Sequence, residues 1–120
     1  MNDSFRLLDP VRQVEAVKAL RAILPAEAVL YEQEDTKPYE CDGRSAYREL
    51  PMVVALPENE EQVGRILRAC RELKVPVVAR GAGTGLSGGA LPHGKGVLLS
   101  LAKMKRILAL DPVARTARVQ

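Results

Sequence analysis

The sequence predicts an α+β domain in which a β-α-β unit with a short parallel sheet is followed by the start of an antiparallel sheet. Two observations support this prediction. The apolar strand-like segments Met52–Leu56 and Val77–Arg80 flank a segment with helical periodicity, and a right-handed crossover makes such strands parallel. Farther along, Ile107–Leu110 and Ala114–Gln120 are strand-like arms joined by an Asp-Pro turn, which predicts an antiparallel pair.

Residues 1–47 are expected to form an N-terminal helix and a connector, and residues 48–120 the first part of the domain proper. Asp9-Pro10 predicts the start of a helix over residues 10–24, which Pro25 ends. Its apolar stripe is predicted to comprise Val14, Ala16, Val17, Leu20 and Leu24. A short strand at 29–31 precedes the polar, irregular segment 32–50. We interpret that segment as a connector that packs on the next unit, with a role in a functional site as the alternative.

The central unit is predicted from its apolar pattern. The wholly apolar run 52–56 is typical of a strand buried on both faces. Acidic residues then open a helix, as the helix dipole favours, and Val75-Pro76 closes it. We expect the helix to pack against both strands through a stripe of Val63, Ile66, Leu67, Cys70 and Leu73. Residues 96–101 predict one more strand.

Glycines gather directly after the strand that ends at Arg80. Five of the nine glycines of the chain fall within residues 81–89. Because ordered glycine costs backbone entropy, the cluster indicates that the backbone approaches a ligand closely. Successive N–H groups of such a loop can hold a phosphate, Thr84 and Ser87 add hydroxyl donors, and Arg80 adds a cation at its entrance. The alternative is a flexible loop or a tight turn. The loop would leave the carboxyl end of a parallel strand, where ligands bind in open α/β sheets.

Two nucleotide-binding motifs almost fit this region. Residues 83–88 satisfy G-x-G-x-x-G, but a dinucleotide fingerprint also needs a following helix and an acid about 20 residues on. The segment 89–96 contains a proline and three glycines and predicts no helix, so we reject the Rossmann interpretation. Residues 89–95 match most of a P-loop, but Gly96 stands where Ser or Thr should bind magnesium.

Composition excludes several classes of protein. Aromatic residues make up only 3% of the 120 residues, which argues against a nucleic-acid binder that stacks bases. Residues 95–120 hold six of the 18 basic residues and one acid; we interpret them as a solvated strand face, with a phosphate-rich partner as the alternative. The spacing of Cys41 and Cys70 predicts neither a metal site nor a disulfide framework. Because the sequence contains no membrane-spanning run and no signal peptide, we expect a cytoplasmic protein with reduced thiols. We expect His93, the only histidine of the sequence, to be a surface residue.

The segment Pro76–Gly89 resembles the FAD-pyrophosphate loop of the vanillyl-alcohol oxidase/para-cresol methylhydroxylase flavoprotein family. The likeness extends to 52–57, 61–63, 96–99 and 104–107. Within that family, residues 39–47 and the tail 111–120 look most like the flavin-bearing D subunits of bacterial glycolate oxidases, with D-lactate dehydrogenases of the same branch close behind. The resemblance covers nearly the whole chain.

The resemblance implies a PCMH-type FAD-binding domain of two subdomains, with FAD between them and its pyrophosphate on the glycine loop. It implies no catalytic residue and no metal site on these 120 residues, because the catalytic histidine and the substrate-binding arginines of the family lie farther along the chain. The cofactor-binding residues that it implies are Arg80, Gly81, Ala82, Gly83, Thr84, Gly85, Ser87, Gly88 and Gly89.

The function that this resemblance implies is oxidation of glycolate to glyoxylate, with hydride transfer to FAD. The alternatives are another small 2-hydroxy acid such as D-lactate, or a non-catalytic nucleotide-binding module. The implied partners are the other subunits of a glycolate oxidase complex, and not nucleic acid; any association with a membrane would be peripheral and through those partners. We expect the 120-residue chain to be a fragment that is inactive alone.

Overall fold

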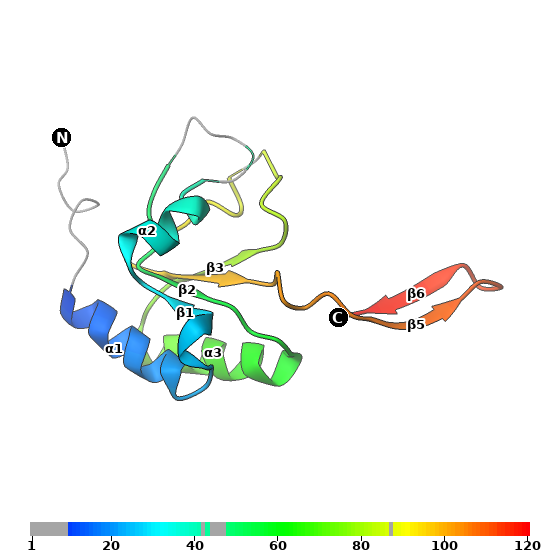
Figure 1. The fold of residues 1–120 in the computed structure, drawn as a ribbon, viewed down its shortest axis with the longest axis horizontal. Coiled ribbons are helices and arrows are strands. Elements are labelled where there is room, and N and C mark those ends of the chain that lie inside the picture. The colour runs from blue at the N-terminus through cyan, green and yellow to red at the C-terminus, as the bar shows by residue number, and fades with distance from the viewer. Residues whose placement is uncertain (1–9, 42, 44–47, 87) are drawn as a thin grey trace.

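The computed structural model describes residues 10–41, 43, 48–86 and 88–120 (Figure 1). Helix α1 (Pro10–Arg21) is followed by a 3₁₀ turn at Ala26–Ala28, strand β1 (Val29–Leu30), the short helix α2 (Gln33–Thr36) and a second 3₁₀ turn at Lys37–Tyr39. The central elements are β2 (Val53–Ala55), α3 (Glu60–Leu73), β3 (Val77–Arg80) and β4 (Val97–Ser100), and the last are β5 (Ile107–Asp111) and β6 (Thr116–Val119).

The first four strands form one sheet in the order β1-β2-β4-β3. Strands β2 and β3 both pair in parallel with β4, whereas β1 is an antiparallel edge strand. The predicted parallel β-α-β unit is therefore confirmed, although β4 lies between its two strands. Helices α1 and α3 lie side by side on one face of the sheet, and the connector lies on the other (Figure 1).

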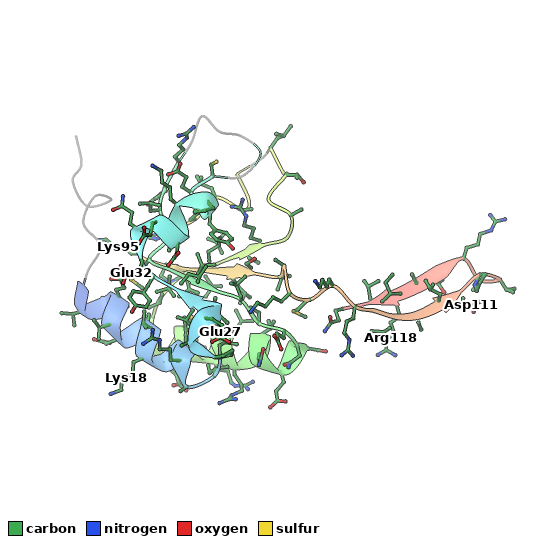
Figure 2. The ribbon with its side chains drawn as sticks, viewed as in Figure 1. Lys18, Glu27, Glu32, Lys95, Asp111 and Arg118 are labelled. Carbon is green, nitrogen blue, oxygen red and sulfur yellow. The ribbon has the colours of Figure 1, made fainter. Side chains whose placement is uncertain are left out.

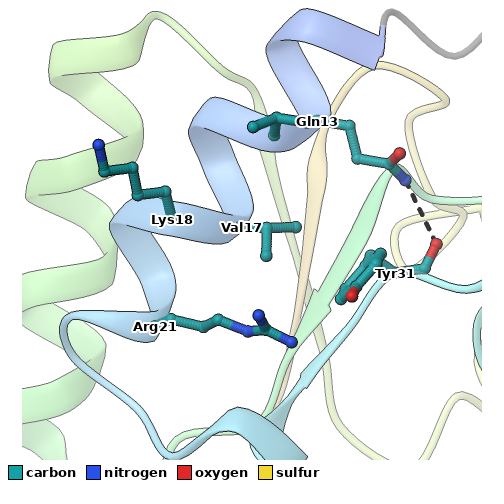
Figure 3. A pocket seen from close by; sticks show the side chains of 6 residues that line it. Gln13, Val17, Lys18, Arg21 and Tyr31 are labelled. Carbon is teal, nitrogen blue, oxygen red and sulfur yellow. Dashed lines mark hydrogen bonds between the residues drawn. The ribbon is translucent and has the colours of Figure 1, made fainter.

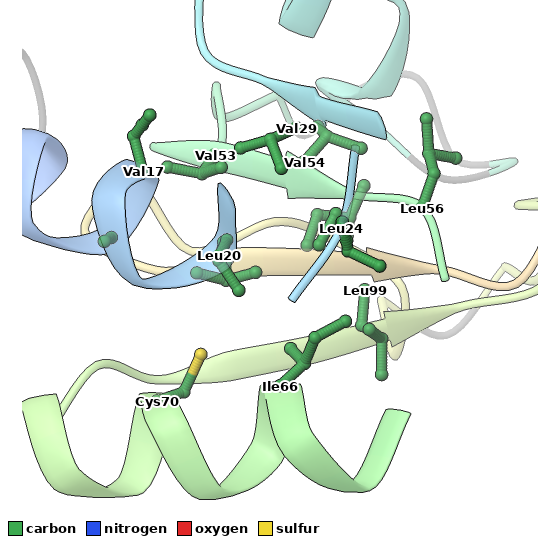
Figure 4. Packing of buried hydrophobic residues seen from close by; sticks show 14 of the residues in the cluster. Val17, Leu20, Leu24, Val29, Val53, Val54, Leu56, Ile66, Cys70 and Leu99 are labelled. Atoms are coloured by element: carbon green, nitrogen blue, oxygen red, sulfur yellow. The ribbon is translucent and has the colours of Figure 1, made fainter. Parts of the chain in front are cut away.

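The core lies between the sheet and these two helices (Figure 4). Residues 51–57 are all buried, and so is every residue of β4, which confirms the prediction that the run at 52–56 is covered on both faces. Leu20 of α1 and Ile66 of α3 are fully buried against this layer. The N-terminal helix thus packs into the same core as the sheet; the proposed boundary at 47/48 stays a prediction.

Helix α3 begins one residue after its cap Asn59, whose side-chain oxygen accepts a hydrogen bond of 2.8 Å from the Gln62 N–H. Gln62 in turn accepts one from the Glu58 N–H, so the two side chains satisfy donors at the helix start reciprocally. At the other end, Lys74 takes the left-handed conformation with φ of 56°. The predicted helix is confirmed with tighter boundaries.

The predicted apolar stripes were wrong at two positions. Leu67 of α3 is 45% exposed and Val14 of α1 is 66% exposed. In α3 the centre of the buried face is occupied by Ile66 and Cys70, and Leu67 lies about 100° further round the helix from Ile66. The residues of α1 that are buried in the core are Ala16, Val17 and Leu20. Leu24, which follows the end of the helix, is buried there as well.

Strands β5 and β6 form the predicted antiparallel hairpin, which projects away from the sheet and gives the molecule a length of 56 Å (Figures 1 and 2). All residues of both strands are exposed. The connector is more regular than predicted, since residues 33–39 form two consecutive helical turns. In the described part of the chain, no helix has the length and apolar character needed to span a membrane.

Candidate glycine-loop site

The glycine loop leaves the carboxyl end of β3, as predicted. Arg80 is the last residue of that strand, and residues 81–86 and 88–89 that follow it are irregular. The Leu101 N–H donates a hydrogen bond of 2.9 Å to the Arg80 carbonyl, so the start of the loop is fixed to the end of β4. Ser87, which the sequence places in the same site, lies outside the described residues.

Much of the loop is open. A Cβ atom built on Gly81, Gly85, Gly88 or Gly89 would have no described atom within 4 Å. Packing within the described chain therefore gives no reason for glycine at positions 81, 85 and 89. No described residue accepts a hydrogen bond from the backbone N–H groups of 81–86. N–H groups without a described acceptor, together with open space at Gly81, Gly85 and Gly89, fit an incoming anionic group such as a phosphate.

Gly83 has a different role from these open glycines. Its φ is +74°, in the left-handed region, and a Cβ there would overlap the guanidinium group of Arg80. Glycine at this position is thus favoured by the backbone conformation, and its lack of a Cβ lets the Arg80 guanidinium lie close to the chain. The loop folds back over the last residue of the strand that precedes it.

The side chain of Arg80 is turned toward the connector. Its Nη1 donates hydrogen bonds to the carbonyl oxygens of Cys41, at 2.7 Å, and Tyr39, at 3.4 Å. The guanidinium carbon also lies 5.6 Å from the centroid of the Tyr39 ring, within the range of a cation–π contact. Arg80 therefore joins two segments about 40 residues apart in the sequence.

A second contact joins the same two segments. The Gly43 N–H donates a hydrogen bond of 2.9 Å to the Gly85 carbonyl. A Cβ on Gly43 would lie only 2.5 Å from the Thr84 carbonyl oxygen, so no larger residue fits there without a shift of the backbone. Sequence reasoning predicted that the connector packs on the next unit but did not assign Tyr39, Cys41 or Gly43 to the loop. The lone glycine within the polar connector was the one available signal.

The P-loop-like segment is a structural turn. The Gly94 N–H donates to a carboxylate oxygen of Glu49, and a Cβ on Gly96 would lie 2.6 Å from the Pro76 carbonyl oxygen. Nδ1 of the exposed His93 accepts a hydrogen bond from the Lys95 N–H. No helix follows in residues 88–96, which supports rejection of both nucleotide motifs. Across the described residues, no cluster of His, Cys, Asp and Glu could hold a metal ion.

The two cysteines are free thiols. Cys70 is buried on α3, and burial raises the pKa of its thiol, whereas Cys41 is half-buried beside the glycine loop.

A hollow lies away from the loop, between α1 and the end of β1 (Figure 3). It has a volume of about 380 Å³ and is lined by Gln13, Val14, Val17, Lys18, Arg21 and Tyr31. The Arg21 guanidinium lies 5.3 Å from the centroid of the Tyr31 ring, and the Gln13 amide donates to the carbonyl oxygens of Tyr31 and Met52. These contacts tie α1 to the sheet. The hollow shares no residue with the glycine loop.

Residues 51–120 match the family model described as "FAD binding domain", so the chain belongs to this family. The resemblance predicted from the sequence is thereby confirmed, and FAD is the cofactor that the family description names. The glycine loop lies within the matched segment, including residues 81–86, whose N–H groups donate to no described residue.

Two curated relatives extend the comparison. The chain is 55% identical over 113 residues to the glycolate oxidase subunit GlcD of Escherichia coli (strain K12), which covers 94% of this chain and 23% of that protein. It is 34% identical over 107 residues to a D-lactate dehydrogenase of Anaerostipes hadrus, covering 88% of this chain and 22% of that one. The chain thus spans less than a quarter of the length of either relative.

Among solved structures, p-cresol methylhydroxylase with substrate bound superimposes with a TM-score of 0.75 at 28% identity. The match covers 89% of this chain and 22% of that one. It confirms the predicted α+β fold of the PCMH type.

Proposed function

We propose that this chain forms the pyrophosphate-binding part of a FAD-dependent 2-hydroxy-acid oxidoreductase whose substrate is glycolate, oxidised to glyoxylate. The observation that carries the FAD-binding role is the open glycine loop at the carboxyl end of β3, with backbone donors that the described residues leave unused. The choice of glycolate rests on the 55% identity to a glycolate oxidase subunit over 94% of the chain.

In this proposal the loop binds the phosphate end of the cofactor chiefly through its backbone. The residues assigned to the cofactor site are Gly81, Ala82, Gly83, Thr84, Gly85, Ser87, Gly88 and Gly89, with Arg80 at the entrance. Backbone N–H groups of an irregular segment can converge on an anion, and the exposed Thr84 adds a hydroxyl donor. Bound FAD would supply the redox chemistry by taking a hydride from the substrate. We assign no catalytic residue to the 120 residues.

A second substrate is supported by a specific observation. The 34% identity to a D-lactate dehydrogenase favours D-lactate, a small 2-hydroxy acid that differs from glycolate by one methyl group. The loop itself lies at the phosphate end of the cofactor and does not discriminate between the two acids. A non-catalytic nucleotide-binding module is the remaining alternative.

The partners and location also belong to this proposal. Because the relative from Escherichia coli is by name a subunit, we propose that the protein assembles with other subunits of a glycolate oxidase complex. The free Cys41 and Cys70 support a cytoplasmic location. Contact with a membrane would be peripheral and through the partner subunits.

The test uses the whole protein that carries this chain. Purified protein is examined for flavin absorbance and assayed with glycolate, D-lactate and an artificial electron acceptor. We expect bound flavin and faster turnover of glycolate than of D-lactate. Faster turnover of D-lactate would favour the second substrate, and bound flavin without turnover of either acid would favour the non-catalytic module.

A loop variant tests the cofactor assignment itself. Gly81→Val places a branched side chain where no described atom lies within 4 Å, so it can block an incoming phosphate without a clash inside the chain. We expect this variant to lose its flavin. Ala114→Val, on the exposed turn of the hairpin, adds apolar bulk away from the loop and should retain flavin. Normal flavin content in Gly81→Val would contradict the assignment.

The 120-residue chain alone should bind FAD weakly and should not oxidise 2-hydroxy acids. The loop is proposed to bind only the phosphate end of FAD, so few contacts offset the entropy cost of association. Titration of residues 1–120 with FAD by calorimetry, together with a glycolate assay, tests this expectation. Sub-micromolar binding with turnover would contradict it.

A further inference from the structure

We propose that Arg80 is a positioning residue, which holds the connector against the glycine loop and so preorganises the loop for FAD, rather than a direct ligand of the pyrophosphate. This inference rests on the proposed function of the loop as the phosphate site. The contacts that carry it join Arg80 and Gly85 to Tyr39, Cys41 and Gly43; we call them the connector clamp.

The first part of the clamp is the guanidinium group of Arg80. Its 2.7 Å hydrogen bond to the Cys41 carbonyl is short and charge-assisted, and such bonds are about twice as strong as neutral ones. The Tyr39 carbonyl and ring provide further contacts to the same group. A side chain held by three contacts with the connector has little freedom to follow a ligand.

The second part is the loop's fold over this group. Gly83 lies so close to the guanidinium that a Cβ would overlap it, and its positive φ turns the chain back at that point. The Arg80 guanidinium therefore lies directly beside the backbone at Gly83. That backbone is part of the proposed phosphate site.

The third part is the contact at Gly43, which involves no side chain and no charge. Its N–H bonds to the Gly85 carbonyl, and its Cα faces the carbonyl of Thr84 closely enough to exclude a Cβ. Residues 80–85 are thus held by the connector at both ends. The hydrogen bonds of the clamp use the Arg80 side chain and the Gly85 carbonyl on the loop side, whereas the N–H groups of 81–86 donate to no described residue and stay available to an anion.

Preorganisation has a measurable consequence for affinity. When only a fraction of molecules holds the loop in the binding conformation, the apparent dissociation constant rises by the inverse of that fraction. Releasing the clamp should therefore weaken FAD binding without removing a group that touches FAD. This separates a positioning role from direct binding.

The experiment measures FAD affinity of the whole apoprotein by flavin fluorescence for Arg80→Met, Gly43→Ala and the double variant. We expect each single variant to bind FAD at least roughly tenfold more weakly, the size expected from losing charge-assisted contacts or from shifting the loop. The double variant should be no weaker than the weaker single variant, because either change alone releases the clamp.

Matched controls are available on α3. Gly64→Ala introduces a Cβ that would lie at an ordinary 3.5 Å from the Arg68 side chain, and Arg65→Met removes an exposed cation. Both should leave FAD affinity unchanged. Arg80→Lys should restore part of the affinity if its ammonium reaches the Cys41 carbonyl.

Hydrogen exchange of the apoprotein supplies a readout that a general loss of stability would not move. The amide of residue 43, which donates to the Gly85 carbonyl in the wild type, should exchange faster in both single variants, while those of β2 and β4 keep their wild-type rates. This readout needs no bound flavin, so it tests the clamp even if Gly81→Val keeps its flavin and the proposed phosphate site fails.

Three outcomes would overturn the inference. One is wild-type affinity in Gly43→Ala with loss in Arg80→Met, which would make Arg80 a direct ligand. Another is a double variant whose loss of FAD-binding free energy equals the sum of the losses in the two single variants. The last is unchanged exchange of the residue 43 amide in both single variants.

Discussion

The parallel sheet and the terminal hairpin are built from similar residues but are placed very differently. Strand β4, with the sequence Val97–Ser100, is buried along its whole length in the centre of the sheet. Strand β5 has a comparable apolar content, yet Ile107 is 64% and Leu110 is 68% exposed. No described residue covers the faces of the hairpin, which projects from the body of the molecule in Figure 2.

The difference shows that strands in this chain are stabilised in two ways. In the sheet, burial of apolar side chains between helices and connector fixes the strands. In the hairpin, the turn does so: a carboxylate oxygen of Asp111 accepts hydrogen bonds of 3.1 Å from the N–H groups of Val113 and Ala114. Arg115 supplies the left-handed residue that the turn needs, with φ of 57°.

The open end of the hairpin is closed by polar contacts as well. The backbone and side chain of Gln120 both bond to the backbone of Arg106, and the Gln120 amide also donates to the Glu58 carbonyl at 3.1 Å. Exposed apolar strand faces and edges favour self-association of the isolated chain. The predictions that follow test whether burial or local turn contacts dominate in each region.

The largest effect is expected for the core. Leu98 is fully buried in β4, so Leu98→Ala should lower the free energy of unfolding by about 2–5 kcal/mol. Leu110→Ala removes the same atoms from a position that is 68% exposed and should change stability by no more than about 0.5 kcal/mol. Urea denaturation of both variants makes the comparison. Equal losses would mean that the hairpin is buried in solution.

A smaller effect on stability is expected from titration of the buried Cys70 thiol. Burial raises the pKa of the Cys70 thiol in the folded protein. The neutral thiol therefore contributes fully to the free energy of unfolding below the unfolded-state pKa of about 8.5, and this contribution is lost as the pH rises toward the pKa of the folded state. Because one group titrates, the free energy of unfolding cannot fall from this cause by more than about 1.4 kcal/mol per pH unit. Urea denaturation between about pH 8 and pH 10 should show a decline in the free energy of unfolding. The Cys70→Ala variant should lack the part of this decline that comes from the thiol. An identical decline in Cys70→Ala would contradict the assignment.

The turn of the hairpin should matter locally. Asp111→Ala removes the acceptor for two backbone N–H groups, and hydrogen exchange of β5 and β6 should show opening easier by about 1 kcal/mol. Amides of β2 and β4 should keep their wild-type protection. Asp111→Asn keeps an oxygen acceptor and serves as the conservative control. Loss of protection across the sheet would show that the hairpin and sheet fold as one unit.

Much of this fold was predictable because its signals are local. The apolar run at 52–56, the helical periodicity after it and the glycines after Arg80 each predicted an element that the structure contains. The strand order was not predicted, since the insertion of β4 between β2 and β3 depends on which strand best fills the centre of the layer. Three parallel strands with apolar sequences carry no residue pattern that orders them.

The connector contacts could not be predicted for a different reason. Arg80 bonds to the carbonyl oxygens of residues about 40 positions earlier, and carbonyl oxygens are common to all residues. The sequence therefore predicted a cation at the loop entrance but not the direction in which it points. The glycine pattern predicted the loop because the requirement there concerns residue type: at Gly83 and Gly43 a Cβ does not fit.

The smallest effect is expected for Leu67 of helix α3, which sequence reasoning placed on the same buried face as its neighbour Ile66. Ile66 is fully buried, so Ile66→Ala should cost about 2–5 kcal/mol. Leu67 is 45% exposed, and its replacement by alanine loses only part of a side-chain contact while it keeps a favourable helix former, so Leu67→Ala should cost only about 0.5 kcal/mol. Thermal and urea unfolding of the two variants measure the difference directly. Leucine and isoleucine differ in helix propensity by much less than the expected difference in cost, so the comparison chiefly reports burial. A cost for Leu67→Ala as large as that for Ile66→Ala would mean that the outer face of α3 is covered in the folded protein.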